Sequence, residues 1–250
     1  MAARRSAGGA VDGELLGGRL SAALPAPGWW LVAGTGVLAA ASVLAGQRSR
    51  ARSHGRALAG FVALGTLVHE AGHAFAAIAT GGGVRTISVD SAESGVTWTW
   101  FPSWLSNLLT TFAGYAAPPL AGLGAAALLD QGRAPAVLTI TLAVSAFVLL
   151  VARGWFTFLV VLAVGGTAFC ALHWGGPLPQ QAIAYSLAWL LLLTEAGGVL
   201  ALVRLWRRGG AHGDAHALAA LTRAPAPIWI AAWAAVIGWS CWTAVPLLWP

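Results

Sequence analysis

The sequence predicts an all-α polytopic membrane protein with six, or else seven, transmembrane helices and a small β-hairpin. Of its 250 residues, 58% are hydrophobic and 9% are charged, and the mean hydropathy is +0.75. A soluble domain has about a quarter of its residues charged, so this chain lacks the polar surface that water would require. Several apolar stretches also approach the roughly 20 residues that cross a hydrocarbon core of about 30 Å.

The basic residues support a membrane protein and argue against a nucleic-acid partner. All 14 of them are arginines, and the formal net charge is +6. Many stand in short runs beside apolar stretches, which is typical of the cytoplasmic flanks of membrane spans. No nucleic-acid-binding motif interrupts these stretches. The abundance of Ala, Gly, Arg and Trp without Lys favours a bacterial source, so we expect an integral protein of the bacterial inner or plasma membrane, surrounded by the lipid bilayer.

The N-terminal residues differ in composition from the rest of the chain. Residues 1–27 are rich in Gly and Ala and contain no continuous apolar core, so we expect a disordered tail without a cleavable signal peptide. Residues 28–250 are predicted to form a single membrane-embedded domain. Its first apolar stretch covers about residues 29–46, a run of arginines follows, and a second stretch covers about residues 57–81.

A more polar segment, residues 82–106, follows the second stretch and is predicted to be a β-hairpin insertion. Apolar and polar residues alternate around Ile87 and again around Trp98, on either side of a polar turn that contains Gly. Such period-two alternation around a turn is typical of a hairpin. The tryptophans of this segment also suit the aromatic belt at a membrane interface.

The remaining apolar stretches leave the number of crossings open. They cover about residues 108–129, 136–152, 155–172, 183–203 and 228–248. If all seven stretches crossed the membrane, the arginines that precede residue 57 and the run that begins at Arg204 would lie on opposite sides, against the positive-inside rule. We therefore favour a broken pair of half-helices around Arg153 with one net crossing, which gives six crossings. Seven ordinary helices are the alternative.

The second stretch contains the motif HEAGH at residues 69–73. His69 and His73 are four residues apart and would share one face of a helix, where two imidazoles can bind one tetrahedral zinc ion. Glu70 stands beside them and can take a proton from a zinc-bound water and pass it to a leaving amine. Ionisable residues inside an apolar helix are costly unless they serve a function, so we predict a Zn²⁺ site with Glu70 as the catalytic residue.

The segment from Val68 to Ala77 resembles the zinc-binding helix of the site-2 protease family of intramembrane metallopeptidases. The Gly-rich stretch 80–83 and the small residues and prolines of residues 112–122 extend the likeness. It covers roughly residues 64–129 and is closest to the bacterial B-like branch of the family. The resemblance implies cleavage of membrane-embedded peptide segments by a zinc-activated water, with the two histidines as ligands and the glutamate as base.

The third metal ligand is harder to assign. In the site-2 protease family it is an aspartate in a Leu-Asp-Gly type motif on a later helix, and this sequence has no such motif. Asp214 is our first candidate. It lies in the polar loop 209–223, where it would either cap a short helix or reach the metal from the membrane mouth. Glu195 is the runner-up, because it lies in an apolar stretch and needs a partner, either the metal or Arg153.

Two further features have open interpretations. Arg153 would either anchor the chain at the interface, or polarise the scissile carbonyl or pair with Glu195. The hairpin is either structural or a substrate-binding element, because an exposed strand edge can hold an unwound peptide by β-addition. The candidate substrate-binding residues on it are Val84, Ile87, Val96 and Trp98.

Together these features favour a membrane-embedded zinc metallopeptidase that acts on a membrane-protein or peptide substrate. Two alternatives remain open. A catalytically inactive scaffold of the same fold would bind partner helices, and the missing Leu-Asp-Gly motif is its main support. A metal or small-solute transporter would use His69, Glu70 and His73 as a transit site, although the sequence lacks the internal symmetry that many transporters show.

Overall fold

The computed structural model describes residues 23–49, 56–91, 94–210 and 213–249. In chain order its elements are α2 (Trp29–Ser49), α3 (Arg56–Ala79), β1 (Gly83–Ser91), β2 (Ser94–Trp100), α4 (Trp104–Asp130), α5 (Ala134–Val151), β3 (Ala152–Arg153), α6 (Trp155–Trp174), α7 (Pro177–Arg207), α8 (Asp214–Thr222) and α9 (Ala226–Leu248). Most of the expected N-terminal tail, residues 1–22, lies outside the described residues. Leu24, near its end, donates its backbone N–H to the carbonyl of Gly132 at 2.9 Å.

The prediction of an all-α polytopic membrane protein is confirmed. Six of the described helices are long and apolar enough to cross a membrane, namely α2, α4, α5, α6, α7 and α9. Many large apolar side chains on these helices are exposed, for example Val37, Leu150 and Trp242. An apolar surface of this kind is suited to lipid rather than to water.

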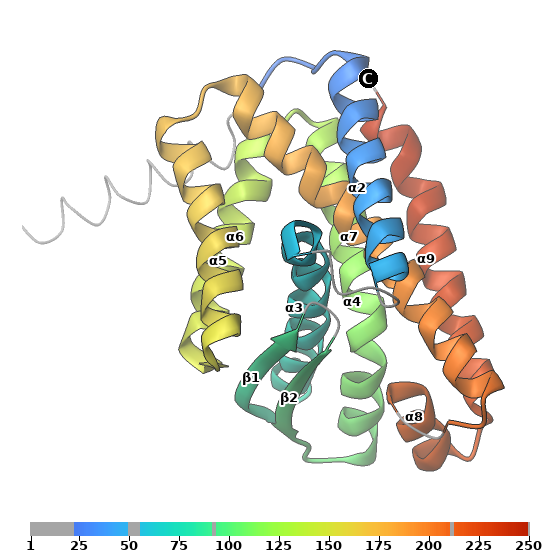
Figure 1. The fold of residues 1–250 in the computed structure, drawn as a ribbon. Coiled ribbons are helices and arrows are strands. Elements are labelled where there is room, and N and C mark those ends of the chain that lie inside the picture. The colour runs from blue at the N-terminus through green and yellow to red at the C-terminus, as the bar shows by residue number, and fades with distance from the viewer. Residues whose placement is uncertain (1–22, 50–55, 92–93, 211–212, 250) are drawn as a thin grey trace, which may run out of the picture.

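The two stretches around Arg153 differ from the sequence prediction, which treated them as one broken crossing. Helices α5 and α6 are each long enough to cross and lie side by side (Figure 1). The chain reverses between them at β3 and at Gly154, whose φ of +83° favours glycine. Arg153 therefore lies at a turn, and its side chain is exposed.

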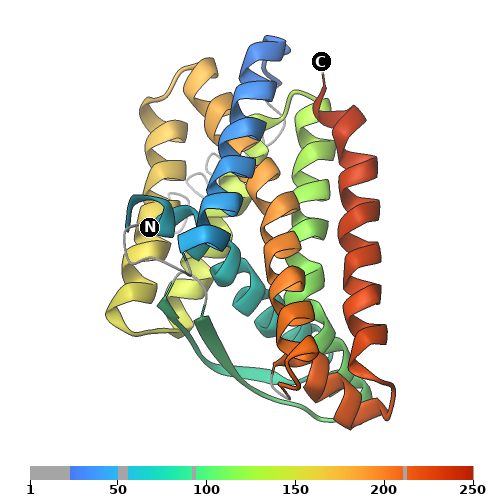
Figure 2. The same cartoon turned by 45° about the vertical axis from the view of Figure 1, so that its right-hand side comes forward.

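Helix α3 carries the HEAGH motif. It lies among the other helices and runs towards the end of the bundle where the hairpin is found (Figures 1 and 2). It approaches α4 closely because residue 72 is Gly. A Cβ at this position would lie 2.6 Å from Ala117 Cβ and 2.9 Å from the carbonyl oxygen of Ala113.

The β-hairpin after the HEAGH helix is confirmed as β1 and β2, and its turn residues 92–93 lie outside the described part of the chain. The two strands are antiparallel, with Ile87 opposite Thr97, and the short β3 pairs in parallel with the other edge of β1. Val96, Trp98 and Trp100 form the exposed face of β2, and its alternate residues face inward. The strand thus presents threonines to α3 and tryptophans to the surroundings.

Arginines gather at the end of the bundle that carries the hairpin. Helix α7 runs to this end and finishes in Arg204, Arg207 and the cap residue Arg208 (Figure 1). Arg153 belongs to the same end, because β3 pairs with β1. Arg133 lies in the connection between α4 and α5 at the opposite end.

Candidate metal centre

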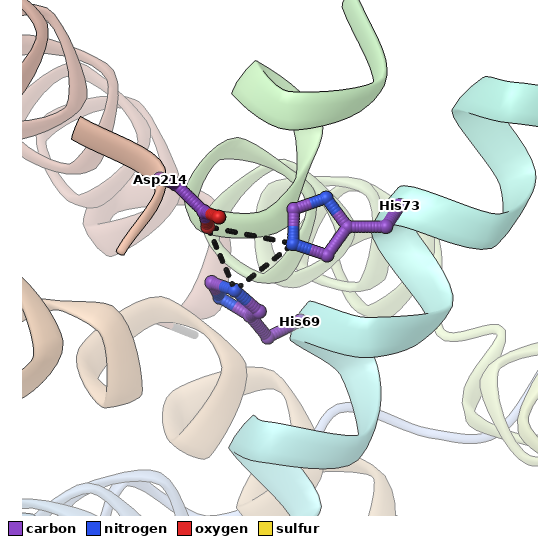
Figure 3. Close-up of side chains that lie close together, drawn as sticks. All are labelled: His69, His73 and Asp214. Carbon is purple, nitrogen blue, oxygen red and sulfur yellow. Dashed lines mark hydrogen bonds and ion pairs between the residues drawn. The ribbon is translucent and has the colours of Figure 1, made fainter. Parts of the chain in front are cut away.

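The two histidines of the HEAGH motif and Asp214 point their ligand atoms at one another (Figure 3). The Nε2 atoms of His69 and His73 lie 3.2 Å apart on successive turns of α3. The Asp214 Oδ2 atom lies 3.2 Å from His69 Nε2 and 3.4 Å from His73 Nε2. The structure thus brings together the three residues that the sequence analysis selected as metal ligands.

The spacing of these three atoms fits a zinc ion. In a tetrahedral site with bonds of about 2.0–2.1 Å, ligand atoms lie roughly 3.3 Å from one another. The three observed separations of 3.2, 3.2 and 3.4 Å match the edges of one face of such a tetrahedron. Two imidazoles and one carboxylate also leave a fourth position open, as catalytic zinc sites require.

Space next to the histidines is kept open by Gly114 on α4. A Cβ at this position would lie 2.5 Å from His73 Nε2 and 2.7 Å from His69 Nε2. Any larger residue would therefore press on both ligand nitrogens. The absence of a side chain at residue 114 thus leaves room for an ion beside the two nitrogens. The sequence analysis did not identify Gly114 as part of the site.

The tautomer of His73 is fixed by its second ring nitrogen. Its Nδ1 atom lies 2.7 Å from the carbonyl oxygen of Thr110, on α4. A carbonyl can only accept a hydrogen bond, so we assign the proton of the neutral ring to Nδ1. The Nε2 atom is then left with its lone pair directed at His69 and Asp214, as a metal ligand requires.

Glu70 is buried and is held by the hairpin. Glu70 is 5% exposed. Thr97 Oγ1 on β2 donates a hydrogen bond to Glu70 Oε2 at 2.6 Å. A Cβ at Gly95 would lie 2.7 Å from the other carboxylate oxygen, so β2 passes directly over the acid. Sequence reasoning missed Thr97. The alternation along β2 could have found it, because Thr97 must face away from Trp98.

Asp214 reaches the site from α8, a nine-residue helix outside the membrane spans. The helix is anchored by Ala215 and Leu218, which are buried against residues of the cluster around Trp233. It is also anchored by Trp104, whose Nε1 donates to the carbonyl of Leu221 at 3.1 Å. One interpretation of the sequence expected Asp214 to be the N-cap of this helix, and that interpretation is wrong. The cap position is Gly213, and Asp214 is the first helical residue.

The electrostatics of Asp214 favour its ionised form. Burial by itself would raise the pKa of this carboxyl. When the Nε2 atoms of His69 and His73 are protonated, as they can be without a metal, their hydrogen bonds and charges outweigh burial and hold the pKa of Asp214 below its usual range. The residue is therefore a carboxylate at neutral pH, which is the state that binds a cation.

Replacing Asp214 by Asn is expected to weaken zinc binding by more than about a hundredfold, because the loss of a direct ligand should exceed the 10–100-fold effect of an outer-shell partner. Titration of the detergent-solubilised protein with zinc against a chromophoric chelator measures this. Asp130→Asn is the matched control, because Asp130 is an exposed carboxylate at the far end of α4. Wild-type zinc affinity in Asp214→Asn would show that Asp214 is not a ligand.

A cavity of about 550 Å³ opens in front of the three candidate ligands and Glu70. Helices α3, α4 and α7, strand β2 and the start of α8 contribute to its wall. Threonines are frequent in its lining, which includes Thr66, Thr97, Thr99, Thr110 and Thr194. The lining is polar enough to admit water beside the carboxylate, within an otherwise apolar bundle.

The hairpin residues predicted to bind substrate have different positions. Ile87 is fully buried in the core with Val148 and Val161, so its side chain cannot contact a substrate, contrary to expectation. Val84 packs against the same core cluster. Val96 lines the cavity, whereas Trp98 is 65% exposed on the outer face of β2. Among the described strands, β1 is paired on both sides at Ile87, and β2 has the outer edge.

Glu195 is not placed as a metal ligand, and Arg153 neither pairs with it nor lines the cavity. The Oε1 atom of Glu195 lies 3.6 Å from Nδ1 of His69, on the side of the ring that faces away from the other two candidate ligands. Arg153 is exposed in β3 and does not line the cavity. Glu195 therefore meets a ligand histidine rather than the metal position or this arginine.

Comparison with known protein families identifies the family of the chain. The chain matches the family model Peptidase M50B-like over residues 26–244. It matches no curated protein and no solved structure. The matched region includes the HEAGH helix, the hairpin and Asp214, and it leaves out only the first 25 and last six residues. The chain therefore belongs to the Peptidase M50B-like group, which is part of the site-2 protease family of membrane metallopeptidases.

Proposed function

We propose that the protein is a membrane-embedded zinc metallopeptidase that hydrolyses peptide bonds in or near the bilayer. The observation that carries the proposal is the convergence of His69, His73 and Asp214 on one point, with Glu70 beside them in the same cavity. A complete donor set next to a buried acid is what metal-assisted hydrolysis requires. Zinc, when bound, supplies a Lewis acid that lowers the pKa of a coordinated water and polarises the substrate carbonyl.

The protein's own acid–base group is Glu70. Its carboxylate is oriented by Thr97 at 2.6 Å and lies in the cavity with the metal ligands. It would accept a proton from the attacking water and then deliver it to the amine of the leaving peptide. Glu70 is therefore a carboxylate again at the end of each cycle, and no second proton carrier is needed.

The substrate would lie along β2. Peptide bonds within a helix are hydrogen-bonded and shielded, so a membrane segment must unwind before it can be cleaved. The outer edge of β2 can pair with an unwound segment, main chain to main chain, with little demand on its sequence. Thr97 and Gly95 of this strand contact Glu70, so a segment paired there would pass next to the acid.

The alternative of an inactive scaffold is weakened by the position of Asp214. Its main support was the missing Leu-Asp-Gly motif, and the structure shows a carboxylate at hydrogen-bonding distance from both histidines despite that absence. For a transporter, the described residues provide no observation that favours it over hydrolysis. The peptidase proposal therefore remains the leading one.

The proposal predicts that cleavage depends on bound metal. Protein purified in detergent should contain about one zinc ion and cleave a peptide that includes a transmembrane segment. Removal of zinc by a chelator should abolish cleavage, and adding zinc back should restore it. Cleavage that persists in metal-free protein would refute the proposed mechanism. Stoichiometric zinc without cleavage of any membrane substrate would instead favour the scaffold.

A further inference from the structure

Glu195 is a buried carboxylate that the proposed hydrolysis does not use. It lies in the middle of α7, on an otherwise apolar stretch, and is 5% exposed. A carboxylate in such surroundings is costly unless a partner compensates its charge. The ion pair that the structure shows for it is with His69, one of the candidate metal ligands.

The geometry of this pair places Glu195 behind the metal position. Its Oε1 atom is 3.6 Å from His69 Nδ1, which is an ion-pair distance and too long for a hydrogen bond. The opposite ring nitrogen, Nε2, is the atom that faces His73 and Asp214. Glu195 thus approaches His69 only at the nitrogen that does not join the ligand set.

Close packing between α3 and α7 creates this approach. Gly65 lies one turn before His69, and a Cβ there would overlap the side chain of Thr194, so α7 can cross α3 only at a glycine. The next residue on α7 is Glu195. Gly198, three residues later, leaves room for the carboxylate, since a Cβ at 198 would lie 2.8 Å from Glu195 Oε2 and 2.8 Å from the ring of Tyr115.

The ring of His69 is bounded on another side by Tyr115. The two rings meet edge to face, with centroids 4.6 Å apart and an interplanar angle of 90°. Tyr115 and Glu195 together restrict the rotation of the imidazole. His73 has an equivalent support in the carbonyl of Thr110, at 2.7 Å from its Nδ1 atom. Each candidate ligand histidine therefore has a partner on its second nitrogen.

From these contacts we infer that Glu195 is a positioning residue for His69. Its negative charge faces His69 Nδ1, which favours the tautomer that carries its proton there and directs its Nε2 lone pair at the metal position, and the carboxylate limits the orientations open to the ring. Carboxylates in this position raise the basicity of the ligand, and their loss typically lowers metal affinity 10–100-fold. The inference rests on the proposed metal site but not on the peptidase activity.

The test is a zinc titration of three variants, in competition with a chromophoric chelator. Glu195→Leu removes the carboxylate that faces Nδ1 and is expected to weaken zinc binding 10–100-fold. Glu195→Gln keeps an acceptor oxygen but no charge, and should lie between Glu195→Leu and the wild type. Gln181→Leu is the matched control, because it removes another buried polar side chain from α7, and its zinc affinity should be unchanged.

Cobalt substitution supplies a second readout. The visible absorption of Co²⁺ depends on ligand geometry, so it should change in Glu195→Leu and stay as in the wild type in Gln181→Leu. Wild-type zinc affinity and an unchanged cobalt spectrum in folded Glu195→Leu would overturn the inference. A loss of zinc as complete as that in Asp214→Asn would overturn it too, because that is the effect of removing a direct ligand. If the wild-type protein itself binds no zinc, the proposed function fails as well; if only Glu195→Leu behaves as wild type, the proposed function stands.

Discussion

Replacing Glu70 by Gln is expected to give a protein that binds zinc as the wild type does but cleaves its substrate a hundred to ten thousand times more slowly. Gln has the size of Glu and can still accept the hydrogen bond from Thr97 through its amide oxygen, so the packing under β2 should be kept. The amide cannot take up a proton at neutral pH. The substitution therefore removes the acid–base step and leaves the metal ligands in place.

The measurement pairs zinc content with cleavage of a transmembrane substrate in the same preparation. Zinc content is the internal control, because it shows whether the candidate ligands still converge. Equal cleavage by the variant and the wild type would mean that Glu70 is not the base or that a contaminating peptidase is responsible. Loss of zinc together with cleavage would assign Glu70 a structural role that the present geometry does not suggest.

The sequence could predict the part of the site that is local along one helix. His69, Glu70 and His73 lie within five residues, and helix geometry alone puts the two histidines on one face. Asp214 is 141 residues beyond His73, and Glu195, in an apolar stretch, was the alternative. Choosing between them needs the position of α8, which depends on packing against α4 and α9 that no local pattern encodes.

The hairpin shows a second limit of sequence reasoning. Alternation predicted both strands, but it could not tell which apolar face meets the protein core and which meets lipid. Ile87 was assigned to substrate binding and is fully buried, whereas Trp98, with the same alternation, is 65% exposed. Inside a bilayer both environments favour apolar side chains, so hydropathy does not separate them. The inward Thr97, a polar residue, was the more informative signal.

The membrane crossings show how a charged residue between two apolar stretches can mislead sequence reasoning. The positive-inside rule required six crossings, and the described structure has six suitable helices. Sequence reasoning merged α5 with α6 because Arg153 interrupts them. The structure instead places Arg153 in a turn next to β1. A charged residue between two apolar stretches fits a tight reversal as well as a break.

Replacing Gly114 by Ala is expected to reduce zinc affinity by about a hundredfold or more, taking the outer-shell effect as the lower bound. The added Cβ would lie 2.5 Å from His73 Nε2 and 2.7 Å from His69 Nε2, so the two imidazoles must move apart or α4 must move away. Stability should not fall for reasons of helix propensity, since Ala favours a helix over Gly by about 1 kcal/mol. Loss of zinc without loss of the fold is therefore the distinctive outcome.

Gly124 gives a matched control on the same helix. A Cβ at Gly124 meets nothing within 4 Å, so Gly124→Ala makes the same chemical change without touching the site. Zinc titration and a thermal melt of both variants separate the two effects: Gly124→Ala should bind zinc as the wild type does. If Gly114→Ala also kept its zinc, Gly114 would not limit the space beside the two ligand nitrogens, because a small movement of the imidazoles or of α4 would have accommodated the methyl group.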